Sequence, residues 1–179
     1  MRGRCLTVDP DTARRAGRAA AGHLVATAEY RACRRLVAYV ELPGELPVGA
    51  FVERAQSDGK EVLWPRLGRE GDLEFAPVAR LEELVAGRHG VREAPRSAAG
   101  VAVGTEALLL VPGLAFDETG GRLGRGGGAW DRTLAGLPGA YAFGVGYEFQ
   151  IVQAVPREPH DRAVDALVTE RGARRCRGR

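Results

Sequence analysis

Apolar residues recur at helical spacing in VGAFVERAQSDGK, residues 48–60, which predicts a helix that ends near its glycine. Upstream, residues 9–35 are rich in alanine and arginine, and both residue types favour helices. Asp9 or Asp11 beside a proline is a typical start for that helix. The pattern AWDRTLAGL, residues 129–137, predicts a short third helix.

Apolar runs bounded by turn residues predict strands between these helices. The most apolar run, residues 106–117, has no alternation of polar and apolar positions, as expected of a central strand covered on both faces. Shorter runs predict the other strands: RLVAYVEL, EVLWPRL, DLEFAPV, AYAFGVGY and DALVTER.

Strand and helix segments alternate along the chain, which is typical of an α/β fold. We expect a three-layer α/β/α, Rossmann-like architecture with a largely parallel central sheet. Residues 1–172 would form one domain, and residues 173–179 a basic, disordered tail. Ligands of such folds bind at the carboxyl ends of strands, and a glycine-rich segment directly follows residues 106–117.

Composition narrows the classes to which the chain can belong. Its hydrophobic fraction of 45% and charged fraction of 27% are those of an ordinary globular protein. Neither a signal peptide nor a bilayer-spanning run of about 20 apolar residues is visible in the sequence. The three cysteines form no CxxC motif, so a disulfide framework or a zinc site is not expected. We expect a monomeric cytoplasmic protein with no membrane partner.

The net charge of +3 comes from the C-terminal end of the chain. The last nine residues, RGARRCRGR, contain five arginines and no acid, and without those five charges the remainder carries −2. A basic end can bind polyanions, but it is more often a solvated terminus. Nucleic acid is therefore the least expected partner, and its binding would have to depend on residues 171–179 and on salt.

Residues 122–132, RLGRGGGAWDR, concentrate glycine between a buried strand and a helix. Glycine favours tight turns and places where a ligand presses against the backbone. A flexible hairpin tip is the simplest interpretation. However, Arg122, Arg125, Asp131 and Arg132 bracket the turn, and backbone N–H groups beside arginines can bind an anion. The spacing matches neither the Rossmann nor the Walker pattern, yet it favours phosphate binding over a bare turn.

The longer stretch LVPGLAFDETGGRLGRGGGAWDR resembles the signature of the 5-formyltetrahydrofolate cyclo-ligase (5,10-methenyltetrahydrofolate synthetase) family. That signature consists of a strand followed by VPGLAFD and then RLGxGxGxYDR. The segment PGELPVGAFVERAQSDGKEVLWPRL is similar to the family's glutamate-containing strand–helix–strand, and REAP to its Glu-Pro turn. The segment YEFQIVQAVPREPHDRAVDALVTERG resembles the family's closing segment. The resemblance extends over residues 9–172.

The resemblance implies an ATP- and Mg²⁺-dependent conversion of 5-formyltetrahydrofolate to 5,10-methenyltetrahydrofolate, with release of ADP and phosphate. A formamide carbonyl is a poor electrophile and its oxygen is a poor leaving group. Phosphorylation of that oxygen solves both problems, after which N10 of the folate closes the ring and phosphate departs. Such a reaction needs positioning and charge neutralisation rather than a protein nucleophile.

The resemblance also implies which residues form the site. The ATP site would be lined by Arg122, Leu123, Gly124, Arg125, Gly126, Gly127, Gly128, Ala129 and Trp130. The folate would contact Val40, Glu45, Arg125, Gly126, Gly127, Gly128 and Ala129. Arg125 and Asp131 would act in catalysis, and Asp131 and Asp161 would hold Mg²⁺, a hard cation that prefers oxygen ligands. Trp64 and Phe75 are weaker candidates for the pterin pocket.

Several of these residues also have a plain structural interpretation. Asp131 could support the start of its helix electrostatically. Asp161 could be a turn residue, and Glu45 a solvated turn residue. Trp64 and Phe75 lie on predicted strands, where core packing is the default.

The chain departs from the family pattern in two places. Family members begin with a longer basic helix that reaches the ATP phosphates, whereas MRGRCL matches only its end, and Arg2 and Arg4 fall past the needed positions. Ala129 stands where the motif has an aromatic ring, although Trp130 keeps the following one. Three explanations stay open: a longer natural N-terminus, substitution by Arg2 or Arg4, or a diverged paralogue. Such a paralogue would bind nucleotide or folate without turnover, as a regulatory or binding protein.

Overall fold

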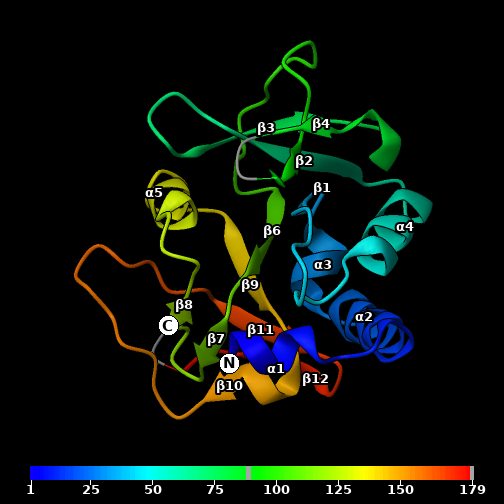
Figure 1. Cartoon of the computed structure of the whole chain (residues 1–179). Helices are drawn as coiled ribbons and strands as arrows, with labels where there is room; N and C mark the ends of the chain where they lie inside the picture. Colours follow the sequence, from blue (N-terminus) through cyan, green and yellow to red (C-terminus); the bar gives the residue numbers. More distant parts are fainter. Residues whose placement is uncertain (88–89, 178–179) are drawn as a thin grey trace.

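The computed structural model describes residues 1–87 and 90–177. Within them, a large central sheet runs in the order β12-β11-β9-β6-β1-β2-β3 (Figure 1). Its inner strands pair in parallel, and the edge strands β3 and β12 are antiparallel to their neighbours. The strands of this sheet are β1 (Arg35–Val37), β2 (Glu61–Leu67), β3 (Leu73–Pro77), β6 (Ala107–Pro112), β9 (Tyr141–Val145), β11 (Ala166–Thr169) and β12 (Gly172–Arg175).

Two smaller sheets accompany the central one. The first has the order β10-β7-β8, and the second pairs β4 with β5. Their strands are β4 (Val85–Ala86), β5 (Arg92–Glu93), β7 (Ala115–Asp117), β8 (Arg122–Leu123) and β10 (Ile151–Val152). The helices are α1 (Arg2–Leu6), α2 (Pro10–Val25), α3 (Ala28–Ala32), α4 (Gly49–Ser57), α5 (Ala129–Ala135) and the 3₁₀ turns η1 (Leu81–Glu83) and η3 (Glu148–Gln150).

The central sheet is covered on both faces, as the α/β prediction requires. Helices α2, α3 and α4 lie on one side, and α5 with the small sheet of β7 and β8 lies on the other (Figure 1). Side chains alternate along β6, so Leu108 belongs to the core cluster under α2 and α4, whereas Leu109 belongs to the cluster with Leu134 of α5. This double coverage explains the continuous apolar run. The expected layered α/β fold with a largely parallel sheet is confirmed.

The predicted start of the long helix is also confirmed. The Asp9 side chain accepts hydrogen bonds from the backbone N–H groups of Asp11 and Thr12, at 3.1 and 3.0 Å, and Pro10 is the first helical residue. A side-chain acceptor at this position satisfies N–H groups that the helix leaves unpaired.

Two predicted strands are wrong in their extent. The run at residues 106–117 is two strands rather than one, because the chain bends at Gly113, where a Cβ atom would lie 2.6 Å from the ring of Phe116. The strand predicted from residue 35 to residue 42 ends at Val37. Beyond it the chain leaves the sheet, and the hydroxyl of Tyr39 donates to the carbonyl oxygen of Leu46 at 2.8 Å.

The prediction of a disordered tail from residue 173 onward is wrong for the residues that the structure describes. Strand β12 pairs with β11 along its whole length, and the following Cys176 is buried, which raises the pKa of its thiol to about 11. Three tail arginines are ion-paired: Arg174 with Glu148 at 3.0 Å, Arg175 with Glu29 at 2.6 Å and Arg177 with Glu118 at 2.9 Å. The tail is therefore part of the sheet, while residues 178–179 lie outside the described range.

We expect a chain that ends at Arg171 to be measurably less stable than the full chain. It would lose the β11–β12 ladder and the buried Cys176, at about 1 kcal/mol per hydrogen bond and about 3 kcal/mol in all. The melting temperature, followed by circular dichroism, should fall by at least about 6 °C. An unchanged melting temperature would mean that the strand contributes nothing to the fold.

No helix within the described residues is long and apolar enough to cross a membrane.

Candidate active site

A cavity of about 620 Å³ lies at the carboxyl ends of β1 and β6, a volume typical of small-molecule sites. Tyr39 and Val40 reach it from the segment after β1, and Pro112 and Gly113 from the end of β6. Apart from the weaker candidates Trp64 and Phe75, the residues that the family resemblance assigned to the site line this cavity: Val40, Glu45, Arg122, Leu123, Gly124, Arg125, Gly126, Gly127, Gly128, Ala129, Trp130, Asp131 and Asp161.

The glycine-rich loop between β8 and α5 has two kinds of glycine. Gly126 and Gly128 have positive φ angles of 93° and 64°, a backbone conformation that other residues rarely adopt. Gly127 has no such angle, and a Cβ atom there would meet no described protein atom within 4 Å. Neither packing nor backbone geometry within the described chain therefore requires glycine at position 127. Because this residue lines the cavity, the open space beside it is space that a ligand can occupy.

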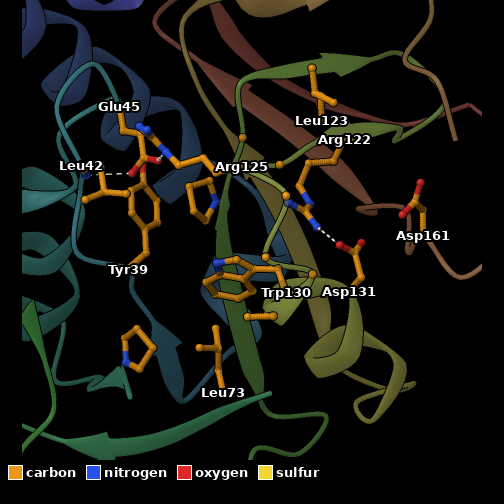
Figure 2. Close-up of a pocket in the computed structure, with 18 of the residues that line it drawn as sticks. Tyr39, Leu42, Glu45, Leu73, Arg122, Leu123, Arg125, Trp130, Asp131 and Asp161 are labelled. Atoms are coloured by element: carbon orange, nitrogen blue, oxygen red, sulfur yellow. Dashed lines mark hydrogen bonds and ion pairs between the residues drawn. The ribbon is translucent and has the colours of Figure 1, made fainter. Parts of the chain in front are cut away.

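Arg122 and Asp131 form a largely buried ion pair behind this loop. Arg122 Nη2 lies 2.8 Å from Asp131 Oδ2, and the two side chains are only 4% and 17% exposed (Figure 2). The backbone N–H of Arg162 donates to the other oxygen of Asp131 at 3.2 Å. Arg122 Nε is buried and has no hydrogen-bond partner within the described residues. An anionic ligand that reached this nitrogen would satisfy a donor that the protein leaves unpaired.

A second ion pair, between Arg125 and Glu45, joins the glycine-rich loop to the segment after β1. Arg125 Nε donates to Glu45 Oε1 at 2.9 Å, and the backbone N–H of Leu42 donates to Glu45 Oε2 at 2.9 Å (Figure 2). The Glu45 side chain is only 8% exposed, so it is not the solvated turn residue of the simplest interpretation. The two residues assigned to nucleotide and folate contact each other directly.

The cavity has an apolar side and a polar side. Figure 2 shows Tyr39, Leu42 and Leu73 on one side, Asp131 and Asp161 on the other, and Trp130 between them. Burial, followed by the nearby charges of Glu45 and Glu41, raises the pKa of Tyr39 well above its usual value, so its hydroxyl remains a donor. The apolar side suits a flat ring, and the polar side suits a charged group.

The two acidic residues expected to hold Mg²⁺ lie on this polar side without forming a complete metal site. Asp161 Oδ2 accepts the backbone N–H of Glu158 at 2.7 Å, as a turn residue does, while Asp131 pairs with Arg122. Within residues 1–87 and 90–177, no group of three or more His, Cys, Asp or Glu side chains could hold a metal ion. Mg²⁺ commonly binds through one or two carboxylates together with substrate phosphates and water, and two carboxylates on one cavity wall fit that mode.

The sequence-based list of site residues contains errors and omissions. Trp64 and Phe75 do not line the cavity, since both are buried in the core, where packing was the alternative interpretation. Cavity residues that sequence reasoning missed include Tyr39, Leu42, Pro65, Leu73, Arg157 and His160. His160 directly precedes Asp161 and Arg157 lies four residues before it, and that proximity was an available signal. Pro65 and Leu73 lie on strands, and nothing in their pattern separates them from core residues.

Asp117, at the end of β7, connects two segments next to the cavity. Its Oδ1 accepts hydrogen bonds from the backbone N–H and the hydroxyl of Thr119, at 2.9 and 2.6 Å, and from the N–H of Gly121 at 2.9 Å. Its Oδ2 accepts from the N–H of Val155 at 2.9 Å. Burial opposes ionisation, but these hydrogen bonds outweigh it and lower the pKa of Asp117 to about 2.

We expect Asp117→Asn to lower the free energy of unfolding at pH 7 by about 2 kcal/mol, which corresponds to the depression of the pKa from 3.8 to about 2. A carboxylate with a lowered pKa stabilises the fold above pH 3.8, and that contribution disappears as the pH falls through about 2. Urea unfolding of both proteins should therefore show a difference that narrows between pH 4 and pH 2. The exposed neighbour Glu118, changed to Gln, should alter stability by less than about 0.5 kcal/mol at either pH.

Comparison with known proteins shows the family to which the chain belongs. The family model described as "5-formyltetrahydrofolate cyclo-ligase family" matches residues 2–170. The chain belongs to this family. The 5-formyltetrahydrofolate cyclo-ligase of Escherichia coli (strain K12) is 31% identical over 174 residues, which cover 94% of each chain.

Two further cyclo-ligase relatives extend the comparison. The 5-formyltetrahydrofolate cyclo-ligase of Mycolicibacterium smegmatis is 32% identical over 142 residues, which cover 76% of this chain and 73% of that protein. The solution structure of Aquifex aeolicus 5,10-methenyltetrahydrofolate synthetase superposes with a TM-score of 0.83 at 28% identity, covering 99% of this chain and 90% of that one. The chain is thus similar to enzymes over nearly its whole length.

The two departures from the cyclo-ligase pattern can now be located. Neither Arg2 nor Arg4 lines the cavity, and the guanidinium of Arg4 lies 4.4 Å from the centre of the Phe149 ring. The geometry therefore does not support the explanation that Arg2 or Arg4 takes the place of the missing basic residues of the N-terminal helix. Ala129 does line the cavity, and the remaining aromatic wall is Trp130, whose ring centre lies 6.4 Å from that of Phe75.

Proposed function

We propose that this chain converts 5-formyltetrahydrofolate to 5,10-methenyltetrahydrofolate with ATP and Mg²⁺, releasing ADP and phosphate, as a monomer in the cytoplasm. The observation that carries the proposal is one cavity that an open glycine-rich loop lines, with apolar residues on one side and buried Arg122 and two carboxylates on the other. A reaction that transfers phosphate to a folate requires these two environments side by side.

The proposed chemistry assigns a task to each side of the cavity. Bound ATP supplies the phosphoryl group that turns the formyl oxygen into a leaving group. On the polar side, Asp131 and Asp161 would hold Mg²⁺ and Arg122 would neutralise charge on the phosphate oxygens, to which Arg125 would also donate from its place beside Glu45. On the other side, the Glu45 carboxylate would accept N–H groups of the pterin ring, with apolar contact from Val40.

Ring closure then needs only orientation from the protein. As N10 attacks the formyl carbon, the N10–C bond forms, the bond from carbon to the phosphorylated oxygen breaks, and the N10 proton passes to solvent. The glycine-rich loop would hold the reacting atoms against its backbone, and Trp130 would limit the access of water. Holding the two reacting groups in the right orientation is enough to accelerate such a step.

A turnover assay tests this proposal. Purified protein is mixed with 5-formyltetrahydrofolate, ATP and Mg²⁺, and the methenyl product is followed by its absorbance. Product that forms only when all three are present supports the proposal. Saturable binding of nucleotide or folate without product would support the alternative, a paralogue that acts as a regulatory or binding protein. A chain with an upstream in-frame extension is assayed in parallel, because its activity alone would point to a longer natural N-terminus.

A further inference from the structure

Arg157 is a cation at the cavity wall to which the proposed chemistry gives no task. Its side chain is 38% exposed, and its Nη2 donates to the hydroxyl of Thr119 at 2.8 Å and to Asp117 Oδ1 at 3.3 Å. No hydrogen bond is found for its Nε or Nη1 within the described residues. The guanidinium is thus held along one edge and has donors available along the others.

The loop that carries Arg157 is fixed at both ends by buried or partly buried carboxylates. At one end, Asp117 accepts the N–H of Val155 at 2.9 Å, and at the other, Asp131 accepts the N–H of Arg162 at 3.2 Å. Arg157 therefore lies on a segment tied to the polar side of the cavity, four residues before Asp161.

Gly121 packs closely against both members of the Asp117–Arg157 pair. A Cβ atom at Gly121 would lie 2.7 Å from Arg157 Nε and would also overlap with Asp117 Oδ2. Gly121 has no positive φ angle, so backbone conformation does not require glycine there. Glycine at this position instead leaves room for the Asp117 carboxylate, which is the nearer group, and for the guanidinium beside it.

The charge of Asp117 does not account for the presence of Arg157. Asp117 already accepts four hydrogen bonds, from Thr119 twice and from Gly121 and Val155, all at 2.9 Å or less. The contact with Arg157 is the longest of the set, at 3.3 Å. Asp117 and Thr119 hold the guanidinium through Nη2, which leaves Nε and Nη1 without a hydrogen bond in the described chain and able to donate to a further anionic group.

We propose that Arg157 binds phosphate oxygens of the nucleotide, and that Asp117 and Thr119 are positioning residues for its guanidinium. The inference rests on the proposed function and deepens it. Arginine suits this task because its planar fork donates in parallel to two oxygens. A folate carboxylate offers the same chemistry, but Arg157 lies on the loop of Asp161, which is on the opposite side of the cavity from Tyr39 and Leu42.

The test is calorimetric binding of the non-hydrolysable ATP analogue adenosine 5′-(β,γ-imido)triphosphate with Mg²⁺, in the absence of folate. Arg157→Ala should bind the analogue at least 10-fold more weakly than the wild type, and Arg157→Lys should recover only part of the loss. The Kd for 5-formyltetrahydrofolate alone should not change. Arg174→Ala is the matched control, since Arg174 is 34% exposed and ion-paired to Glu148 outside the cavity.

The positioning residues are tested through KM and kcat. Thr119→Val, an exposed position, should raise the KM for ATP about 3-fold while kcat and the KM for folate stay within error. Asp117→Asn should raise the KM for ATP further than Thr119→Val does. Glu148→Gln is the matched control, because Glu148 also accepts from a threonine hydroxyl and an arginine yet lies outside the cavity. A purely structural role for Asp117 predicts the same kinetic constants for both variants.

The outcomes separate this inference from the proposed function. Unchanged analogue binding by Arg157→Ala, in a protein that forms product, overturns the inference and leaves the function intact. Weaker binding of folate alone would show that Arg157 contacts a folate carboxylate and would overturn the assignment to phosphate. A wild-type protein that neither binds the analogue nor forms product overturns the proposed function, and the inference with it.

Discussion

Gly127→Ala is expected to abolish most ligand binding while leaving the fold intact. A methyl group at this position meets no described protein atom within 4 Å, and φ is not positive, so the folded chain accommodates it. Loss of glycine flexibility in the unfolded chain should even raise stability by about 0.5 kcal/mol. A nucleotide or folate pressed against the loop backbone, however, would collide with the new methyl group. We expect kcat/KM to fall at least 100-fold.

Gly22→Ala is the matched control for this experiment. Gly22 is an exposed residue of α2, outside the cavity, and a Cβ atom there also meets nothing within 4 Å. Alanine should stabilise that helix by about 0.5–1 kcal/mol without changing kinetics. Both variants are compared by thermal unfolding and by the turnover assay. If Gly127→Ala is as active as Gly22→Ala, no ligand approaches the loop backbone at this point.

Asp131→Asn is expected to lose both activity and stability. The substitution removes the counter-charge of Arg122, whose side chain is 4% exposed, and an unpaired buried charge costs about 3 kcal/mol. If Asp131 also holds Mg²⁺, turnover should fall about 100-fold or more at fixed Mg²⁺ and should recover in part as Mg²⁺ is raised. Urea unfolding measures the first effect, and Mg²⁺ titration of the initial rate measures the second.

Glu148→Gln again provides a comparison, since it breaks an ion pair with Arg174 away from the cavity. It should lower stability without changing the dependence of the rate on Mg²⁺. If the Asp131→Asn protein is less stable but its rate depends on Mg²⁺ as that of the wild type does, Asp131 serves only as the ion-pair partner of Arg122. That result would remove the metal role.

Local sequence patterns predicted the fold where the deciding contacts are local. The start of α2 follows from Asp9 and its neighbours, and the double coverage of β6 follows from an unbroken apolar run. The division of residues 106–117 was not visible, because it depends on the Phe116 ring packing against Gly113. Strand β12 was missed because its arginine-rich composition is typical of a solvated end. The strand is held by a ladder with β11 and by ion pairs to distant residues such as Glu29, and neither contact is visible in the local sequence.

The candidate site shows the same division. The glycine-rich loop, its flanking residues and Val40, Glu45 and Asp161 were identified from their resemblance to a family, and their roles remain predictions. The pairing of Arg122 with Asp131 and of Arg125 with Glu45 could not be predicted, because it depends on how loops meet across the cavity. Trp64 was considered for the pterin pocket because of its aromatic ring, but its buried position on a strand of the core is enough to explain a tryptophan there.

The Arg125–Glu45 ion pair has a thermodynamic consequence for the proposed enzyme. A nucleotide that attracts Arg125 to its phosphates frees the Glu45 carboxylate for donors of the pterin, and a pterin that engages Glu45 frees Arg125. Whichever ligand arrives first bears the free energy of separating the pair, and the second binds without it. With the roles proposed for these two residues, the two affinities would be linked, and each ligand would strengthen the binding of the other by the same factor.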